Sequence, residues 1–230
     1  MIIVIMVVFG ILSYAVSTRL KNKFKKYSKI PLAKNLSGEE IAKLMLADHG
    51  IHDVKVISVQ GQLTDHYNPV NKTVNLSDGV FHGRNAAAAA IAAHECGHAV
   101  QHATAYSMLE FRSVLVPMQN ASAKVLNIIF MVMLFGGFML PSIIPWNLAL
   151  LVIIGAYGIM TLFSLVTLPV EFDASKRALV WVNERNIVNS SEYDMAKDAL
   201  KWAAMTYVVA ALGFVVTLLY YVSLFLGSRD

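Results

Sequence analysis

Three long segments of the chain contain no charged residue, and polar segments separate them. The apolar segments are residues 1–17, 125–170 and 203–226. A helix needs about 20 apolar residues to cross the hydrocarbon core of a bilayer. The central segment is long enough for two such helices, and the stretch from Pro141 to Pro145 predicts the tight turn between them. The pattern therefore predicts four membrane-spanning helices.

The composition also indicates an integral membrane protein. Of the 230 residues, 57% are hydrophobic and 15% are charged, an apolar share that ordinary soluble domains do not reach. The formal net charge of +4 arises largely from basic residues between Arg19 and Lys29, directly after the first apolar segment. We interpret this cluster as a topology signal, because no nucleic-acid recognition fold accompanies it. The lipid bilayer is an expected partner and nucleic acid is not.

The basic residues predict how the helices are oriented. Basic clusters mark the cytoplasmic ends of membrane helices. If the four helices thread in order, residues 19–29, Lys124 and the group from Lys176 to Arg185 all fall on the cytoplasmic side. Both termini then lie outside. A signal peptide would carry its positive charge before the apolar stretch, so residues 1–17 are expected to form a retained anchor.

This threading divides the chain into five segments. The soluble segments meet on the cytoplasmic face, and the fold class is expected to be mainly α with a small hairpin or sheet. The expected segments are a first transmembrane helix at 1–18, a cytoplasmic part at 19–112, a transmembrane helical hairpin at 113–168, cytoplasmic helices at 169–202 and a fourth transmembrane helix at 203–227.

Local signals predict a helix and a strand early in the cytoplasmic part. Ser37 and Glu40 have the spacing of a capping box, which favours a helix beginning after Ser37. Gly50 fits the end of that helix. Alternating apolar residues from Val54 to Val59 then predict a strand.

A hairpin is predicted after this strand. Residues 61–67, GQLTDHY, are followed by the turn residues NPVNK and by TVNL at 73–76. The edge of such a hairpin could pair with the backbone of an extended substrate. Asp65 and His66 could line the cleft, but alternation leaves every second strand residue in water, and we expect both side chains to be solvated.

Residues 86–102, AAAAAIAAHECGHAVQH, contain the most informative chemical motif of the chain. The alanines favour a helix, in which His94 and His98 stand one turn apart on the same face, roughly 6 Å along the axis. Two imidazoles so placed can bind one Zn²⁺ ion, and Glu95 can act as general base toward a water molecule. The pattern H-E-x-x-H is typical of zincin metallopeptidases. The alternative is a pair of helix histidines that binds no metal.

Two histidines leave a catalytic zinc site one protein ligand short. His102 lies eight residues after His94, about 12 Å along a straight helix, which is too far for both rings to bind one ion. Glu171 is expected to begin a new helix just after Pro169, where its carboxylate could complete a site of two histidines and one glutamate. Alternatively, the negative charge of Glu171 could serve only to stabilise the dipole at a helix start. Spacing alone leaves both roles open for Glu171.

Three motifs together resemble those of the YugP-type membrane zinc metallopeptidases, namely GQLTDHYNP, AAHECGHAVQH and PVEFDASKRA. The resemblance covers nearly the whole chain, including the four spans. More remotely, H-E-x-x-H followed by E-x-x-A is similar to the gluzincins of the HtpX and CAAX-protease type. The resemblance implies metal ligands at His94, His98 and Glu171, a general base at Glu95, and a place in a bacterial plasma membrane.

The chain departs from the remoter relatives at one position. They usually carry an aspartate four residues after the third ligand, where it orients a metal-binding histidine. This chain has Ser175 there. Either Ser175 or the nearby Asp173 would have to supply that hydrogen bond.

The motifs favour one function over two alternatives. We expect a membrane zinc endopeptidase with a zincin-like α+β catalytic part and one Zn²⁺ per chain, active on the cytoplasmic side. The resemblance implies peptide or membrane-protein substrates. A metal-binding scaffold or adaptor without activity would not need Glu95. A transporter would place ionisable residues inside its spans, and residues 125–170 and 203–226 contain none.

Overall fold

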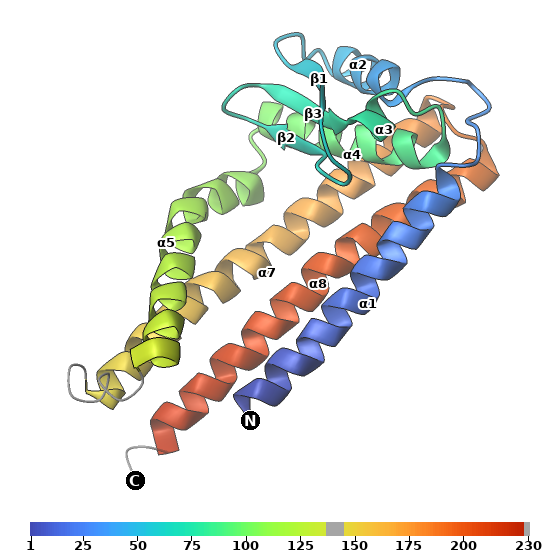
Figure 1. Cartoon of the computed structure of the whole chain (residues 1–230). Coiled ribbons are helices and arrows are strands. Elements are labelled where there is room, and N and C mark those ends of the chain that lie inside the picture. The colour runs from blue at the N-terminus through green and yellow to red at the C-terminus, as the bar shows by residue number, and fades with distance from the viewer. Residues whose placement is uncertain (137–144, 228–230) are drawn as a thin grey trace. The chain divides into compact units, whose positions relative to one another are not determined.

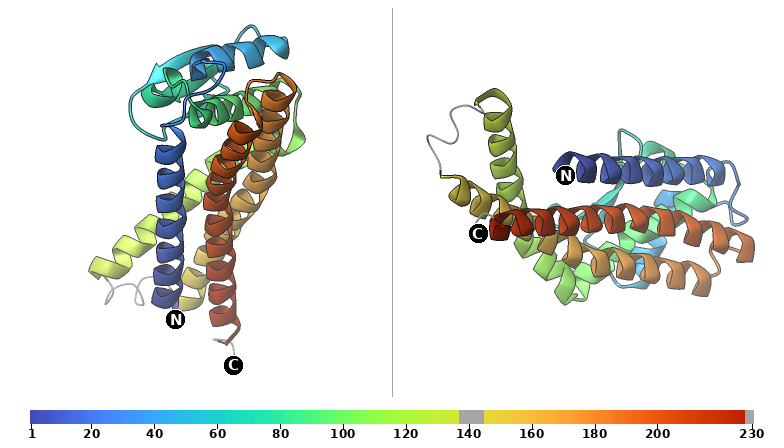
Figure 2. Two further views of the ribbon diagram at one scale, coloured as in Figure 1. Left: turned by 90° about the vertical axis from the view of Figure 1, so that its right-hand side faces the viewer. Right: turned by 90° about the horizontal axis from the view of Figure 1, so that it is seen from below.

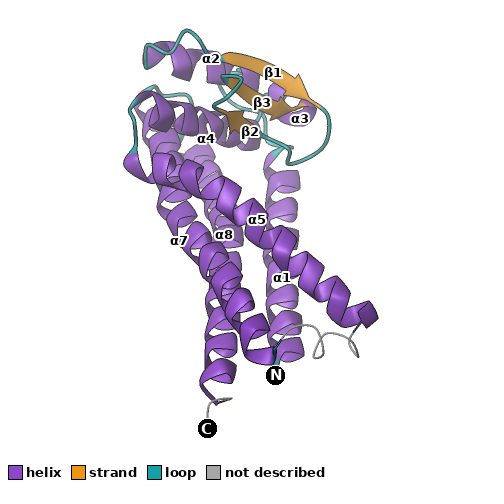
Figure 3. Ribbon diagram, turned by 90° about the vertical axis from the view of Figure 1, so that its left-hand side faces the viewer, coloured by secondary structure: helices purple, strands orange, loops and turns teal. Residues whose placement is uncertain are grey.

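The computed structural model describes residues 1–136 and 145–227, and these are mainly helical (Figures 1 and 3). The helices are α1 (Ile2–Tyr27), α2 (Gly38–Asp48), α3 (Asp78–Phe81), α4 (Ala86–Ala103), α5 (Ser107–Gly136), α7 (Trp146–Glu184) and α8 (Ser190–Gly227). The strands are β1 (Lys55–Val59), β2 (His66–Asn68) and β3 (Thr73–Ser77). The expected mainly α fold with a small sheet is confirmed.

Four of the helices, α1, α5, α7 and α8, are long enough and apolar enough to cross a membrane. Helix α7 has 39 residues and α8 has 38. At 1.5 Å per residue each is nearly 60 Å long, about twice the thickness of the hydrocarbon core. Both helices are therefore longer than one crossing needs. The turn predicted between Pro141 and Pro145 lies, except for Pro145, outside the described residues.

The chain forms two compact units. The first comprises Met1–Ser13, Phe111–Leu168 and Tyr207–Asp230, and the second comprises Tyr14–Glu110 and Pro169–Thr206. Within the first unit α1 and α8 approach closely at Gly213, because a side chain there would lie 3.3 Å from the ring of Phe9. Small residues at such contacts are common between apolar helices.

A three-stranded sheet lies over α4 in the second unit (Figure 1). The strand order is β1-β3-β2, with β3 parallel to β1 and antiparallel to β2. Strands β2 and β3 form the expected hairpin. The side chains of Val74 and Leu76 on β3 are fully buried in the core. Because β2 pairs with β3, this anchored strand holds β2 in place at the edge of the sheet.

The core of the second unit is formed by α2, α4 and this sheet, together with parts of α7 and α8. Helix α2 begins with the predicted capping box, in which Ser37 accepts from the Glu40 amide and the Glu40 side chain accepts from the Ser37 amide. Gly50 follows the helix with a positive φ of 69°, which glycine adopts at little cost. Asn85 caps α4. The alanines of α4 before Ala103 are buried and let neighbouring backbones approach the helix closely.

The second half of α1 is bound to the first part of α8, and the two helices run side by side (Figure 2). Lys23 forms an ion pair of 2.7 Å with Asp198, and the hydroxyl of Tyr27 donates to the same carboxylate. The guanidinium of Arg19 lies 5.3 Å from the ring centre of Trp202. Part of the basic cluster after the first apolar segment therefore has partners inside the protein.

One expectation about the helices is wrong. Glu171 does not begin a new helix, because α7 continues through Pro169 from Trp146 to Glu184. Proline removes one hydrogen bond from a helix, but a long apolar segment on its N-terminal side holds the chain in helical geometry, and such helices tolerate proline. Glu171 therefore lies inside a helix, and the dipole at a helix start does not explain its presence.

Candidate metal centre

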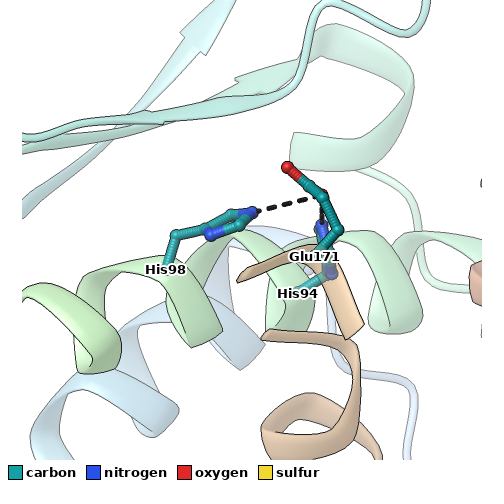
Figure 4. Close-up of side chains that lie close together, drawn as sticks. All are labelled: His94, His98 and Glu171. Atoms are coloured by element: carbon teal, nitrogen blue, oxygen red, sulfur yellow. Dashed lines mark ion pairs between the residues drawn. The ribbon is translucent and has the colours of Figure 1, made fainter. Parts of the chain in front are cut away.

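Three side chains that could hold a metal ion converge in the second unit (Figure 4). His94 and His98 come from α4, and Glu171 comes from α7. Oε2 of Glu171 lies 3.4 Å from Nε2 of His94 and 3.6 Å from Nε2 of His98. The two imidazole rings are 4.8 Å apart between their centres and nearly perpendicular, at 79°. Both nitrogens thus face one carboxylate oxygen.

The two distances from Glu171 to the histidines fit zinc. Tetrahedral coordination with bonds of about 2.0–2.1 Å places ligand atoms about 3.4 Å apart, close to the two distances from Glu171. Two imidazole nitrogens and a carboxylate form a donor set that catalytic zinc uses. Glu171 and His98 are also buried, and a buried carboxylate is costly unless cations or hydrogen bonds compensate it.

The close approach of α4 and α7 brings the three side chains together. A Cβ atom added to Gly97 would lie 2.6 Å from the carbonyl oxygen of Ala174. Because glycine at position 97 has no side chain, the two helices can approach each other closely at this point. Ala174 and Ala178 of α7 are buried. The glycine of H-E-C-G-H thus has a packing role next to the candidate ligand His98.

Each histidine has a hydrogen-bond partner on its second nitrogen. Nδ1 of His94 lies 3.1 Å from the hydroxyl oxygen of Ser175, and Nδ1 of His98 lies 3.0 Å from Oε1 of Gln101. Asp173 accepts a hydrogen bond from Gln101 instead. The structure therefore places Ser175 against His94, at the position where the remoter relatives have an aspartate.

Glu95 lies beside the three candidate ligands and is buried. Its Oε2 atom accepts a hydrogen bond of 3.0 Å from the backbone amide of Tyr67 on β2. Burial raises the pKa of the Glu95 carboxyl, while the charges of His94 and His98 act in the opposite direction. A raised pKa makes the ionised carboxylate a stronger base toward the proton of a neighbouring water molecule.

The other histidine considered as a ligand lies apart from this cluster. His102 is on the same continuous helix α4, is exposed, and has Nδ1 2.8 Å from the hydroxyl of Tyr67. It is not among the three residues whose ligand atoms lie within 4.8 Å of one another. The straight helix keeps it away from the metal position, as the spacing predicts.

The expectation for Asp65 is wrong, and that for His66 is confirmed. Asp65 is partly buried, and its carboxylate accepts hydrogen bonds from the backbone amide and hydroxyl of Ser77. It lies just before β2 and fastens the start of that short strand to the end of β3. His66 is exposed. Alternation failed for Asp65 because this residue precedes the strand and is not part of its pleat.

Two residues at the site were not identified from the sequence. Gln101 contacts His98, and its position three residues after that histidine on the same helix face is a usable signal. Tyr67 contributes through its backbone amide, which no pattern of side chains reveals.

The comparisons with known proteins identify the family of the chain. Residues 2–226 match the family described as "Putative neutral zinc metallopeptidase". The chain is 37% identical over 219 residues to the Bacillus subtilis (strain 168) protein named "Putative membrane protease YugP", which covers 95% of this chain and 94% of the relative. No solved structure matches the chain. Because the match extends over nearly its full length, the chain belongs to the YugP-type zinc metallopeptidase family.

Proposed function

We propose that this protein is a membrane-embedded, zinc-dependent endopeptidase that cleaves peptide bonds on the cytoplasmic side of the membrane. His94, His98 and Glu171 would hold the zinc ion, and Glu95 would act as general base. The observation that carries the proposal is the convergence of the two H-E-x-x-H histidines with a buried glutamate from α7, next to a second buried glutamate. The fold around this site is proposed to be zincin-like.

The residues around the site suit the hydrolysis of an amide bond. Zinc bound there would polarise the scissile carbonyl and lower the pKa of a water molecule. Glu95 would take a proton from the attacking water and deliver it to the leaving amine. Oε2 of Glu95 accepts a hydrogen bond from the Tyr67 amide. The other oxygen, Oε1, therefore remains for proton transfer. The raised pKa of Glu95 makes its carboxylate a stronger base and so favours the first of these transfers.

The edge strand β2 is the proposed binding site for an extended substrate. In an antiparallel pair, a residue whose amide points away from its partner strand also points its carbonyl away. The Tyr67 amide donates to Glu95, so the carbonyl of Tyr67 faces the free edge as well. A substrate strand would pair with this carbonyl beside the general base. The proposed substrates are peptides and membrane proteins.

A metal-binding scaffold without activity is the alternative. A scaffold would need the ligands His94, His98 and Glu171, but it would gain nothing from Glu95. Burying a glutamate lowers the stability of the fold, even though one backbone amide donates to Glu95. A catalytic role would explain why the chain carries this cost. The retention of Glu95 in this geometry favours an enzyme.

Metal analysis and a proteolysis assay on the same purified protein test the proposal. We expect about one zinc ion per chain, hydrolysis of an unstructured polypeptide, loss of hydrolysis on treatment with a zinc chelator, and recovery when zinc is added back. Zinc binding without any chelator-sensitive hydrolysis would favour the scaffold. Protein that binds no zinc would contradict both.

The cytoplasmic orientation predicts which residues a reagent can reach. Asn71 and Ser191 are exposed and belong to the second unit. Single cysteines there, in a Cys96→Ala background, should react with an impermeant thiol reagent only after the cells are permeabilised. The same labelling after permeabilisation serves as the positive control. Ready labelling of both positions in intact cells would reverse the proposed topology.

A further inference from the structure

We propose that Gln101 is a positioning residue that fixes His98 in the tautomer required for metal binding. It does so by accepting a hydrogen bond from Nδ1 of His98 while its amide group is locked in one orientation by acceptors on α7. The inference rests on the proposed zinc site, but its central claim concerns the protonation of one ring and can be tested without metal.

Gln101 is fully buried and uses both ends of its amide. Its side chain has 0% exposure. Oε1 lies 3.0 Å from Nδ1 of His98, while Nε2 donates hydrogen bonds of 2.8 Å to the carbonyl oxygen of Val170 and 2.8 Å to Oδ2 of Asp173. In a buried site with these partners, each unmatched polar atom would cost about 1–3 kcal/mol.

The partners of Gln101 determine which way its amide points. The oxygen and nitrogen of a glutamine amide look alike, and the hydrogen-bond network must assign them. A main-chain carbonyl such as that of Val170 can only accept. Asp173 is an acceptor too, because Nε of Arg177 donates to its Oδ2 atom over 2.6 Å. A flipped amide would place Oε1 against two acceptors, so Nε2 must face Val170 and Asp173.

This orientation leaves His98 one tautomer. Oε1 of Gln101 has no hydrogen to donate, so the hydrogen bond requires a proton on Nδ1 of His98. In a neutral imidazole the other nitrogen then carries the lone pair. That nitrogen is Nε2, which faces Glu171 at 3.6 Å. In this neutral form the metal-facing atom of His98 is available to bind an ion.

The partner of His94 imposes no such choice. Nδ1 of His94 faces the hydroxyl of Ser175 at 3.1 Å, and a hydroxyl can either donate or accept. The two histidines therefore differ in how strongly the protein selects their tautomer. The Gln101 amide selects one tautomer of His98, whereas the Ser175 hydroxyl accommodates either tautomer of His94.

Gln101 also links the two helices that supply the ligands. The Val170 carbonyl to which it donates belongs to the residue just before Glu171. The hydrogen bond therefore holds the backbone of the third ligand against the helix that carries the first two. Loss of the Gln101 amide should make the position of Glu171 less well defined. It should also allow His98 to adopt its other tautomer.

Gln101→Met tests the proposal, because methionine keeps the unbranched shape of glutamine but forms none of its three hydrogen bonds. Nitrogen NMR of metal-free, histidine-labelled protein at alkaline pH reports which ring nitrogen carries the proton, and His98→Gln identifies the His98 signals. We expect a proton on Nδ1 of His98 in the wild type and a mixture of tautomers in Gln101→Met. Zinc affinity, measured by competition with a chelator, should fall roughly 10-fold to 100-fold.

Two variants serve as controls. Asp173→Asn still offers an acceptor, and the Val170 carbonyl still requires a donor, so the tautomer of His98 should not change. Cys96→Ala removes another buried side chain from α4, one that contacts the Ala42 carbonyl of α2. It should change the unfolding temperature of the metal-free protein without changing zinc affinity. A simple loss of packing would affect Cys96→Ala and Gln101→Met alike.

The outcomes separate this inference from the proposed function. A neutral His98 ring that carries its proton on Nε2 and not on Nδ1 in the metal-free wild type would overturn the inference, even if Gln101→Met failed to fold. So would an unchanged tautomer in folded Gln101→Met, or a changed tautomer with unchanged zinc affinity. A wild type that binds zinc but hydrolyses nothing would contradict the endopeptidase proposal and leave the tautomer and affinity results intact.

Discussion

Glu95→Gln is expected to lower peptide hydrolysis by about 10² or more, the order of effect found when a general base is lost. The amide keeps the shape of the side chain, and its oxygen can still accept the hydrogen bond from Tyr67. Glu95 is not one of the three candidate ligands, so zinc should remain bound. Rates on an unstructured polypeptide, normalised to zinc content, measure the effect.

Glu184→Gln is a suitable control for this prediction. Glu184 is the last residue of α7 and is exposed, so the same change of charge there should leave both hydrolysis and zinc content as they are. Full activity in Glu95→Gln would contradict the proposed peptidase mechanism.

Glu171→Gln should reduce zinc affinity by more than the 10-fold to 100-fold that loss of an outer hydrogen-bond partner causes. The substitution removes the only carboxylate among the three candidate ligands, and the remaining amide is a weak donor to zinc. Zinc content after dialysis against a mild chelator measures the loss. His94→Ala and His98→Ala should behave in the same way.

His102→Ala is the matched comparison, because it tests the other residue that the sequence offers as a third ligand. His102 contacts the hydroxyl of Tyr67 and is exposed, so the variant should retain its zinc. Loss of zinc in His102→Ala together with retention in Glu171→Gln would contradict the assignment of Glu171.

Local periodicity was sufficient to predict the parts of the site that lie on one helix. His94 and His98 are one turn apart, and a helix with this spacing places them on the same face wherever it packs. The capping box at Ser37 is equally local and is present. Glu171 could not be assigned in this way, because its approach to α4 depends on tertiary packing, and only the family resemblance indicated it.

The errors have the same physical origin. Pro169 favoured a helix start in the local reading, but the apolar helix on its N-terminal side outweighs one lost hydrogen bond. Asp65 was assigned by alternation to solvent, but its carboxylate satisfies the amide and hydroxyl of Ser77 across the sheet. Partners distant in sequence decide both cases.

The origin of the candidate ligands on two helices has a consequence for how the protein is made. His94 and His98 leave the ribosome early, whereas Glu171 follows only after α5 and the apolar part of α7. A nascent chain that has not yet reached Pro169 has two histidines and no carboxylate to complete the proposed site. Metal capture, and with it the ability to cut polypeptides, would therefore begin only after both of these apolar helices have been synthesised. Newly made chains would thus remain harmless to other proteins during insertion.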